Sequence, residues 1–226
     1  MVKTRLAASL GADDTLLLYR AFLADTAWKL SLVAGAQKVA ALAYDGDAAG
    51  LPADPLGRDP FAGFLVQPQT GSDFGARLGS TLQRALELQA GSVVLVGADT
   101  PEIEGADIED AFRVLEQRDV VLGPADDGGY YLVGMNRFAP ALFQGIAWST
   151  SVVLEQSLAA ARRAGLSAGL VARRPDVDVM DDLVALQLRR KAERAAGRPS
   201  PCPATDAWLD GRIDGQLGPP VLRRTT

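Results

Sequence analysis

Carboxylates recur in this chain where a predicted strand ends, and hard divalent cations take such oxygen ligands. One acid follows the apolar run over residues 92–96, two follow the run over 120–122, and two alternate in a later extended segment, which places the last two on the same side. These candidate residues are Asp99, Asp126, Asp127, Asp176 and Asp178. Their types and spacing suit a metal ion or a polyphosphate ligand. Each acid alone is equally compatible with an ordinary turn or, for Asp99, with a helix N-cap.

The stretch DVVLGPADDGGYYLVG, residues 119–134, is the most informative part of the sequence. Two short runs rich in Val, Leu and Tyr predict strands, and the Gly, Pro and Asp residues between them predict a turn. Glycine allows a backbone to approach a ligand closely. An acidic turn and a ligand-binding loop both fit this stretch when it is taken alone.

Two further segments are suited to an anionic ligand. Lys3 and Arg5 offer a point charge and a bidentate fork to phosphate, although a solvated, charged N-terminus is the better explanation when the segment is taken alone. The loop over residues 67–77 leads into a predicted helix, so its backbone N–H groups can meet an anion. The Gln69 amide in that loop is able to read a nucleobase edge, and a simple capped loop is the alternative.

Hydrophobic periodicity predicts strands that alternate with helices. We expect strands over residues 39–44, 63–67, 92–96, 120–122, 130–133 and 168–171, and helices over 13–34, 76–90, 108–117, 149–164 and 181–195. The helix over 149–164 has Ser149 or Thr150 as its predicted cap. This order predicts an α/β fold with a mostly parallel sheet, in which ligands bind beyond the carboxyl ends of the strands.

The predicted organisation is one domain over residues 1–197 and a tail over 198–226 that contains several Pro and Gly residues. Periodicity is weak in the tail, but its WLDGRI stretch is expected to dock on the domain. The segment over residues 45–60 is rich in Gly, Pro and Asp and predicts a loop.

Composition excludes several classes of function. The chain has 226 residues and no histidine, so catalytic triads and acid–base chemistry that depend on His are excluded. The net charge of −5 gives no basic field for nucleic acid or for an anionic membrane. A single cysteine, Cys202, cannot form an internal disulfide and fits a reducing cytosol. We also expect neither a membrane span nor a signal peptide, and therefore a cytoplasmic protein.

Six motifs occur together in a characteristic order and spacing. They are VKTRL, Q-x-G-x-D-x-G-x-R, VLVGADTP, DVVLGPADDGGYYLVG, I-x-WST and DVDVMDDL. Over residues 2–190 the chain resembles a bacterial family of glycosyltransferase-A-fold proteins described as nucleotide-diphospho-sugar transferases. That family is related to the phospholactate guanylyltransferases and the molybdenum-cofactor guanylyltransferases.

The resemblance implies a Rossmann-like three-layer fold and a divalent cation, Mg²⁺ or Mn²⁺. It implies a role for each matching residue. Metal binding falls to Asp99 and to Asp178 or Asp176, with Asp178 preferred; charge stabilisation and phosphate binding fall to Lys3 and Arg5; base and sugar contacts fall to Gln69, Gly71 and Gly75. The acceptor side takes Asp126, Asp127, Gly128, Gly129, Trp148, Ser149 and Thr150, with Asp127 as a candidate general base.

The chain departs from this family at its beginning. Family members have a hydrophobic strand and a Pro-Gly loop before the VKTRL motif, whereas Met1 stands directly before Val2 here. We therefore expect a central strand of the sheet and half of the phosphate loop to be missing. Our hypothesis is that the start of the chain was assigned too late, at an internal Met codon.

Three functions are compatible with these motifs. In glycosyl transfer, an acceptor hydroxyl attacks the sugar carbon of a nucleotide-diphospho-sugar donor. In nucleotidyl transfer, the phosphate of a small acceptor attacks the α-phosphorus of a nucleoside triphosphate and pyrophosphate leaves. Both need the same cation and acidic scaffold, so the carboxylates do not separate them. The third function is non-catalytic nucleotide binding, which the missing strand favours and the set of acidic motifs opposes.

Overall fold

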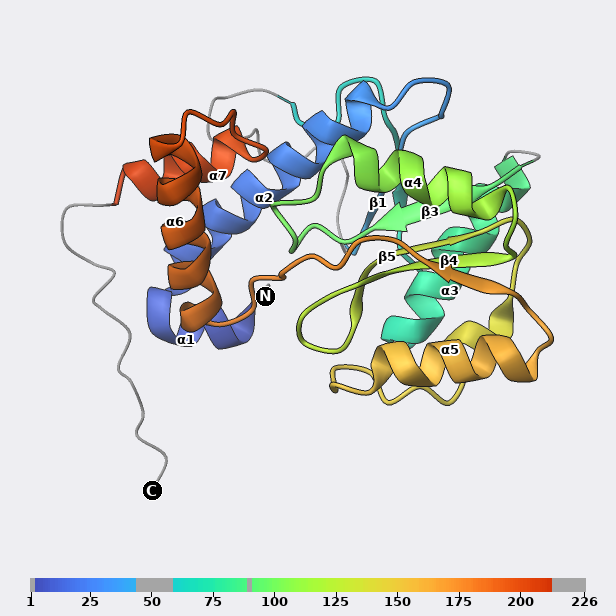
Figure 1. Cartoon of the computed structure of the whole chain (residues 1–226). Helices are drawn as coiled ribbons and strands as arrows, with labels where there is room; N and C mark the ends of the chain where they lie inside the picture. The colour runs from blue at the N-terminus through green and yellow to red at the C-terminus, as the bar shows by residue number, and fades with distance from the viewer. Residues whose placement is uncertain (1–2, 44–58, 89–90, 213–226) are drawn as a thin grey trace.

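The computed structural model describes residues 3–43, 59–88 and 91–212 of the chain. Helices cover strands on both sides, which gives the three-layer, Rossmann-like α/β fold that the sequence predicted (Figure 1). The strands are β1 (Val39–Leu42), β2 (Leu65–Pro68), β3 (Val93–Val96), β4 (Val120–Pro124), β5 (Tyr130–Met135) and β6 (Ala168–Leu170). The helices are α1 (Thr4–Leu10), α2 (Ala12–Leu32), α3 (Phe74–Leu88), α4 (Gly105–Leu115), α5 (Val153–Arg163), α6 (Met180–Ala195) and α7 (Pro203–Asp210). A short 3₁₀ helix spans Pro140–Phe143.

The strands fall into two separate sheets. Strands β1 and β2 pair in parallel, and the other four strands follow the order β3–β5–β4–β6. Strand β5 is antiparallel to both neighbours and β4 is parallel to β6, so only β5 runs against the rest of its sheet. The mixed, mostly parallel arrangement confirms the prediction. Within the described ranges no strand joins β1 to β3.

Side-chain alternation along β4 assigns a helical layer to each face of the four-stranded sheet. Val120 and Leu122 pack with residues of α3 and α5, and Val121 packs between them on the opposite face with Ile108 and Leu115 of α4. These three β4 side chains are fully buried. The short apolar run therefore forms a central strand that is covered on both sides, as continuous apolar strands of parallel sheets usually are.

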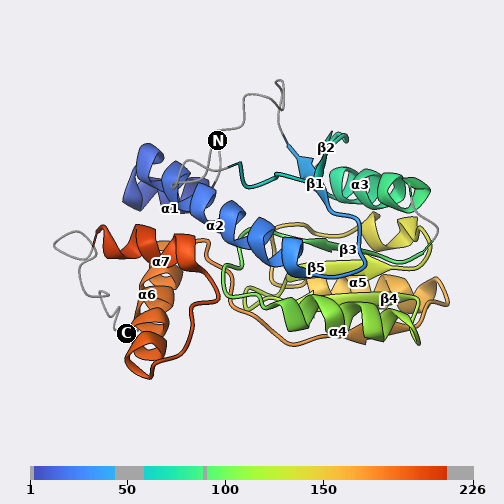
Figure 2. The same cartoon turned by 90° about the horizontal axis from the view of Figure 1, so that it is seen from above.

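Four helices form a second packing unit at one end of the molecule. Helices α1, α2, α6 and α7 gather around buried side chains that include Leu6, Phe22, Leu183 and Trp208 (Figures 1 and 2). The WLDGRI stretch thus docks on the domain, as expected, since most of it lies in α7. Helix α1 was not predicted, because its seven residues are too few to show a clear periodicity. No helix of the described residues is long and apolar enough to cross a membrane.

The predicted start of α5 was wrong. The helix begins at Val153, and Val152 occupies the N-cap position instead of Ser149 or Thr150. The Thr150 hydroxyl donates to the carbonyl of Ala147 at 2.6 Å, so it closes a turn before the helix. Ser149 has a positive φ of 62° within that turn. Most of the predicted loop over residues 45–60 lies outside the described residues.

Candidate active site

An extended segment, residues 174–178, carries two acids past the ends of the strands. The N–H of Val177 donates to the carbonyl of Asp99 at 3.0 Å, which ties the segment to the loop after β3. Val177 is fully buried. Because side chains alternate in extended backbone, Asp176 and Asp178 both point away from that buried side.

Arg174 fixes the beginning of the same segment. Its N–H donates to the carbonyl of Pro124 at 3.0 Å, so the segment continues the sheet beyond the end of β4. Its guanidinium makes two bonds to Asp107 of α4, at 2.9 and 3.0 Å, and lies 3.1 Å from Glu104. Bidentate pairs of this kind set direction as well as charge. The segment is therefore held at both the backbone and the side-chain level.

The turn between β4 and β5 carries Asp127. The Asp127 carboxylate accepts the N–H of Gly129 at 2.7 Å, a local bond typical of Asx turns. Gly128 has a φ of 88°, and a Cβ at this position would stand 2.1 Å from the carbonyl oxygen of Ser151. The N–H of Leu154 also donates to the Gly128 carbonyl at 2.9 Å. The first residues of α5 therefore support the back of the turn.

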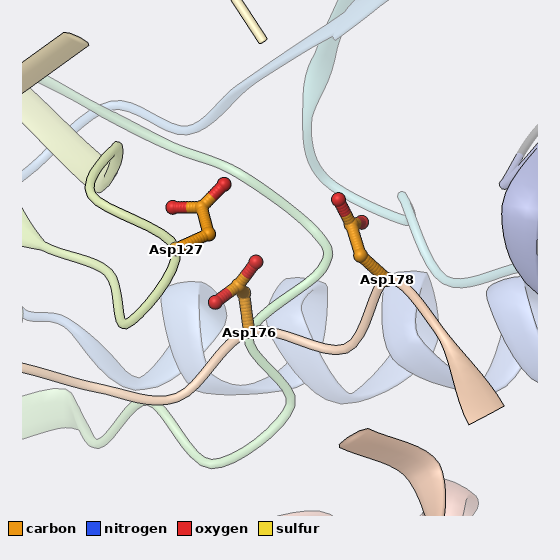
Figure 3. Close-up of side chains that lie close together, drawn as sticks. All are labelled: Asp127, Asp176 and Asp178. Carbon is orange, nitrogen blue, oxygen red and sulfur yellow. The ribbon is translucent and has the colours of Figure 1, made fainter. Parts of the chain in front are cut away.

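The turn and the extended segment bring three carboxylates together. One oxygen each of Asp127, Asp176 and Asp178 lies within 4.8 Å of the other two. Figure 3 shows Asp127 reaching from the turn and Asp176 and Asp178 rising from the extended segment. Burial and the neighbouring negative charges, above all that of Asp127, raise the pKa of Asp176 to about 6. The three clustered carboxylates therefore repel one another.

Two cations border this cluster. The Lys3 ammonium lies 3.3 Å from an oxygen of Asp99 and also contacts Asp178. The Arg5 guanidinium donates to the second oxygen of Asp178 at 2.5 Å. Burial opposes the charge on Lys3, but the two carboxylates outweigh it and raise the pKa of the lysine. Asp178 is consequently shared between the acidic cluster and the cations, whereas Asp99 lies on the lysine side.

The first turn of α3 packs against the IAWST segment, residues 146–150. A Cβ on Gly75 would stand 2.5 Å from Nε1 of Trp148 and 2.9 Å from the carbonyl oxygen of Phe143, so this position accepts only glycine without rearrangement. The Gln69 amide donates to the carbonyl of Ala41 in β1 at 3.3 Å. In this structure the Gln69 amide is therefore bonded to the backbone of β1.

An aromatic group lies beside the Asp127 turn. Trp148 packs edge-to-face against Phe74 and Tyr130, with ring centroids 5.1 and 6.3 Å away. Tyr130 follows the turn directly, and Phe74 is half exposed at the start of α3. Sequence reasoning had included Trp148 but missed Phe74, whose only signal was its place between Asp73 and Gly75 in the loop motif.

The remaining predicted residues are distributed around this centre. Gly71 has a φ of 153° in the exposed loop before α3. Ser149 and Thr150 are exposed next to Trp148. Asp126 stands apart from the three clustered acids, and its nearest cation is Arg173, 4.0 Å away. Arg173 also donates to the carbonyl of Ala125 at 2.5 Å, a contact that the sequence did not predict.

Comparison with known proteins places this architecture in a family. The profile described as "Uncharacterized protein conserved in bacteria (DUF2064)" matches residues 29–150. The chain belongs to this family. The match includes the loop before α3, Asp99, the Asp127 turn and the IAWST segment, while the extended segment that holds Asp176 lies beyond it.

A solved structure resembles this DUF2064 chain over nearly its full length. It is a Desulfovibrio desulfuricans G20 protein described as a "putative nucleotide-diphospho-sugar transferase". The two chains are 31% identical, the similarity covers 93% of this chain and 91% of that one, and the TM-score is 0.75. No curated protein matches the chain. The relation to guanylyltransferases stays a prediction.

Proposed function

We propose that the chain is a divalent-cation-dependent transferase that uses a nucleotide-diphospho-sugar donor. The observation that carries this proposal is the meeting of Asp127, Asp176 and Asp178 within 4.8 Å, with Lys3 and Arg5 at their border. The carboxylates suit a divalent cation and the neighbouring Lys3 and Arg5 suit phosphates, so together they fit a metal-bound diphosphate. The description of the Desulfovibrio desulfuricans protein supports the same class of reaction.

The chemistry of the three carboxylates fits a hard cation. All three offer oxygen, the ligand type that Mg²⁺ and Mn²⁺ take in proteins. Burial and, after it, the negative charge of Asp127 raise the pKa of Asp176, and a bound cation would relieve the repulsion between the carboxylates. We assign Asp176, Asp178 and Asp127 as the ligands, so Asp127 takes a different role from the general base expected on sequence grounds. Asp99 serves to balance the charge of Lys3.

Lys3 and Arg5 are the proposed phosphate-binding groups. Both now pair with Asp178, and a donor diphosphate would draw them away by offering more negative charge. That exchange would free Asp178 for the cation. When bound, the cation would neutralise the charge that develops on the departing diphosphate. Lys3 and Arg5 would stabilise the same charge from the other side.

The acceptor would enter beside the aromatic group of Phe74 and Trp148. Ser149 and Thr150 are exposed directly after Trp148, and both carry hydroxyl groups. An aromatic wall with hydroxyl groups at its edge suits a polyhydroxylated acceptor, whose C–H face packs on the ring.

A thermal-shift experiment with nucleotide diphosphates and nucleotide sugars, with and without Mg²⁺, tests the assignment. We expect stabilisation only when cation and nucleotide are both present. Asp178→Asn should abolish it. Asp181→Asn is the matched control, since Asp181 is exposed nearby and has the same charge. Equal shifts for the two variants would disprove the metal assignment.

The products separate the reaction classes. Glycosyl transfer releases a nucleoside diphosphate, whereas nucleotidyl transfer releases pyrophosphate from a nucleoside triphosphate. A screen of both donor types with hydroxyl and phosphate acceptors should yield the nucleoside diphosphate. Pyrophosphate release would contradict the proposed donor, and metal-dependent binding without any turnover would instead identify a binding protein.

A further inference from the structure

The backbone around Asp178 is fixed by hydrogen bonds on both sides. The Asp182 carboxylate accepts the N–H of Asp178 at 2.8 Å and the N–H of Val179 at 2.9 Å, both through Oδ2. On the other side, the N–H of Val177 donates to the carbonyl of Asp99 at 3.0 Å. Three consecutive N–H groups are therefore held, and the candidate metal ligand Asp178 is the middle residue of the three.

Asp182 belongs to the first turn of α6, which begins at Met180. A carboxylate in the first turn of a helix can reach back to the N–H groups before it, and hydrogen bonds to an ionised acceptor are stronger than neutral ones. Asp181, one residue earlier, is exposed, whereas Asp182 is partly buried. It is therefore Asp182, four residues after Asp178, that joins α6 to the extended segment.

Helix α6 gives Asp182 a firm base. Leu183, the next residue, is fully buried among the four helices at that end of the molecule. Further along the helix, the Arg189 guanidinium lies 2.7 Å from the carboxylate of Glu102, in the loop that follows β3. The helix is thus bound both to the helical unit and to the end of the sheet, so the position of Asp182 is set by contacts outside the acidic cluster.

Three sets of contacts depend on where Asp178 lies. One of its carboxylate oxygens is within 4.8 Å of oxygens of Asp127 and Asp176, and the side chain also pairs with Lys3 and with Arg5. Figure 3 shows Asp178 on the extended segment, directly before the chain enters α6. A rotation of the backbone at this point would carry the carboxylate away from the other two acids.

We propose that Asp182 is a positioning residue of the metal site: it fixes the backbone of Asp178 so that this carboxylate can meet the other two acids. The inference rests on the proposed function, because it takes the three acids as the ligands of the cation. Asp182 itself acts through Asp178 and not on the metal, since its Oδ2 is already used by two N–H groups. Residues that orient a metal ligand in this way typically contribute about 10–100-fold to metal affinity.

The test measures binding instead of turnover. The probe is the Mn²⁺ complex of inorganic pyrophosphate, because a diphosphate is the part that all nucleotide-diphospho-sugars share, and isothermal titration calorimetry gives its dissociation constant. Asp182→Ala should weaken binding about 10-fold. In the same variant the amides of Asp178 and Val179 should exchange with solvent about 10-fold faster, because they lose their acceptor.

Two further variants separate position from charge. Asp182→Asn keeps an oxygen that can accept both N–H groups, so its affinity for the probe should stay within about threefold of the wild type. Asp181→Ala removes the same charge from the same turn and should also bind like the wild type. Wild-type affinity in Asp182→Ala, or an equal loss in either of the other two variants, would overturn the proposal.

A failure of the proposed function has a different signature. If the wild-type chain does not bind the probe, the metal site itself is refuted. Faster exchange of the Asp178 amide in Asp182→Ala would still show that Asp182 fixes this part of the backbone, and unchanged exchange would refute that role whether or not the probe binds.

Discussion

The Asp127 turn depends on Gly128, and Gly128→Ala is the sharpest single test of the site's construction. The new Cβ would stand 2.1 Å from the carbonyl oxygen of Ser151, and backbone cannot move aside as the end of a flexible side chain can. Overpacking typically costs about 1–3 kcal/mol. A non-glycine residue at a φ of 88° adds about 1 kcal/mol. The sum is about 2–4 kcal/mol.

For a chain of 226 residues, each kcal/mol lowers the melting temperature by about 2–4 °C, so Gly128→Ala should lower it by about 4–16 °C. Calorimetry or circular dichroism measures this directly. Gly105→Ala is the control, because a Cβ there meets nothing within 4 Å and the residue begins a helix. If Gly128→Ala melts with the wild type, the turn does not pack on the start of α5 and the described geometry of Asp127 is wrong.

Other predictions concern buried and charged groups. Asp25→Ala should cost about 2–6 kcal/mol, because it orphans the buried N–H groups of Ala204 and Thr205, whereas Thr205→Val, which removes only the hydroxyl bond, should cost about 1 kcal/mol in denaturant titrations. Burial raises the pKa of Cys202 to about 12, so a thiol reagent at pH 8 should modify it only after unfolding, and rapid labelling of the folded protein would contradict its burial. The folded state binds the Asp176 proton more tightly than the unfolded state does, since folding raises the pKa to about 6. Protonation of Asp176 therefore stabilises the folded protein; this contribution is complete below about pH 4 and is lost as the pH rises through 6. Without divalent cations, Asp176→Asn should therefore raise the melting temperature at pH 8 and leave it nearly unchanged at pH 4, and a lower value at pH 8 would refute the pKa direction.

The strands were predictable because short apolar runs bounded by turn residues are typical of buried strands. Val120–Pro124 is buried along its whole length, and its bounding Gly, Pro and Asp residues mark the turn unambiguously. The start of α5 was not predictable, because Ser and Thr close turns as readily as they cap helices. The Thr150 hydroxyl donates to the carbonyl of Ala147 and so closes a turn instead of capping α5. No local sequence pattern distinguishes these two roles.

For the site, the sequence predicts which edge of the sheet carries the acids but not which of the acids meet. Acids that follow parallel strands lie at the carboxyl end of the sheet, so the sequence could place Asp99, Asp127 and Asp178 at the same edge. Which acids meet was not predictable, because it depends on long-range register. The bond from Val177 to Asp99 and the exclusion of Asp126 by its turn are consequences of how the segment after β6 lies.

Lys3 connects the acidic cluster with the loop that follows β3. Its ammonium is nearly buried between Asp99 and Asp178, and its backbone, with a φ of 48°, turns the chain into α1. How readily the ammonium leaves Asp178 for a phosphate therefore depends on its second partner, Asp99, which holds it at the border of the cluster. Lys3 would be able to turn toward a phosphate in this way while Asp127 and Asp176 stay in place.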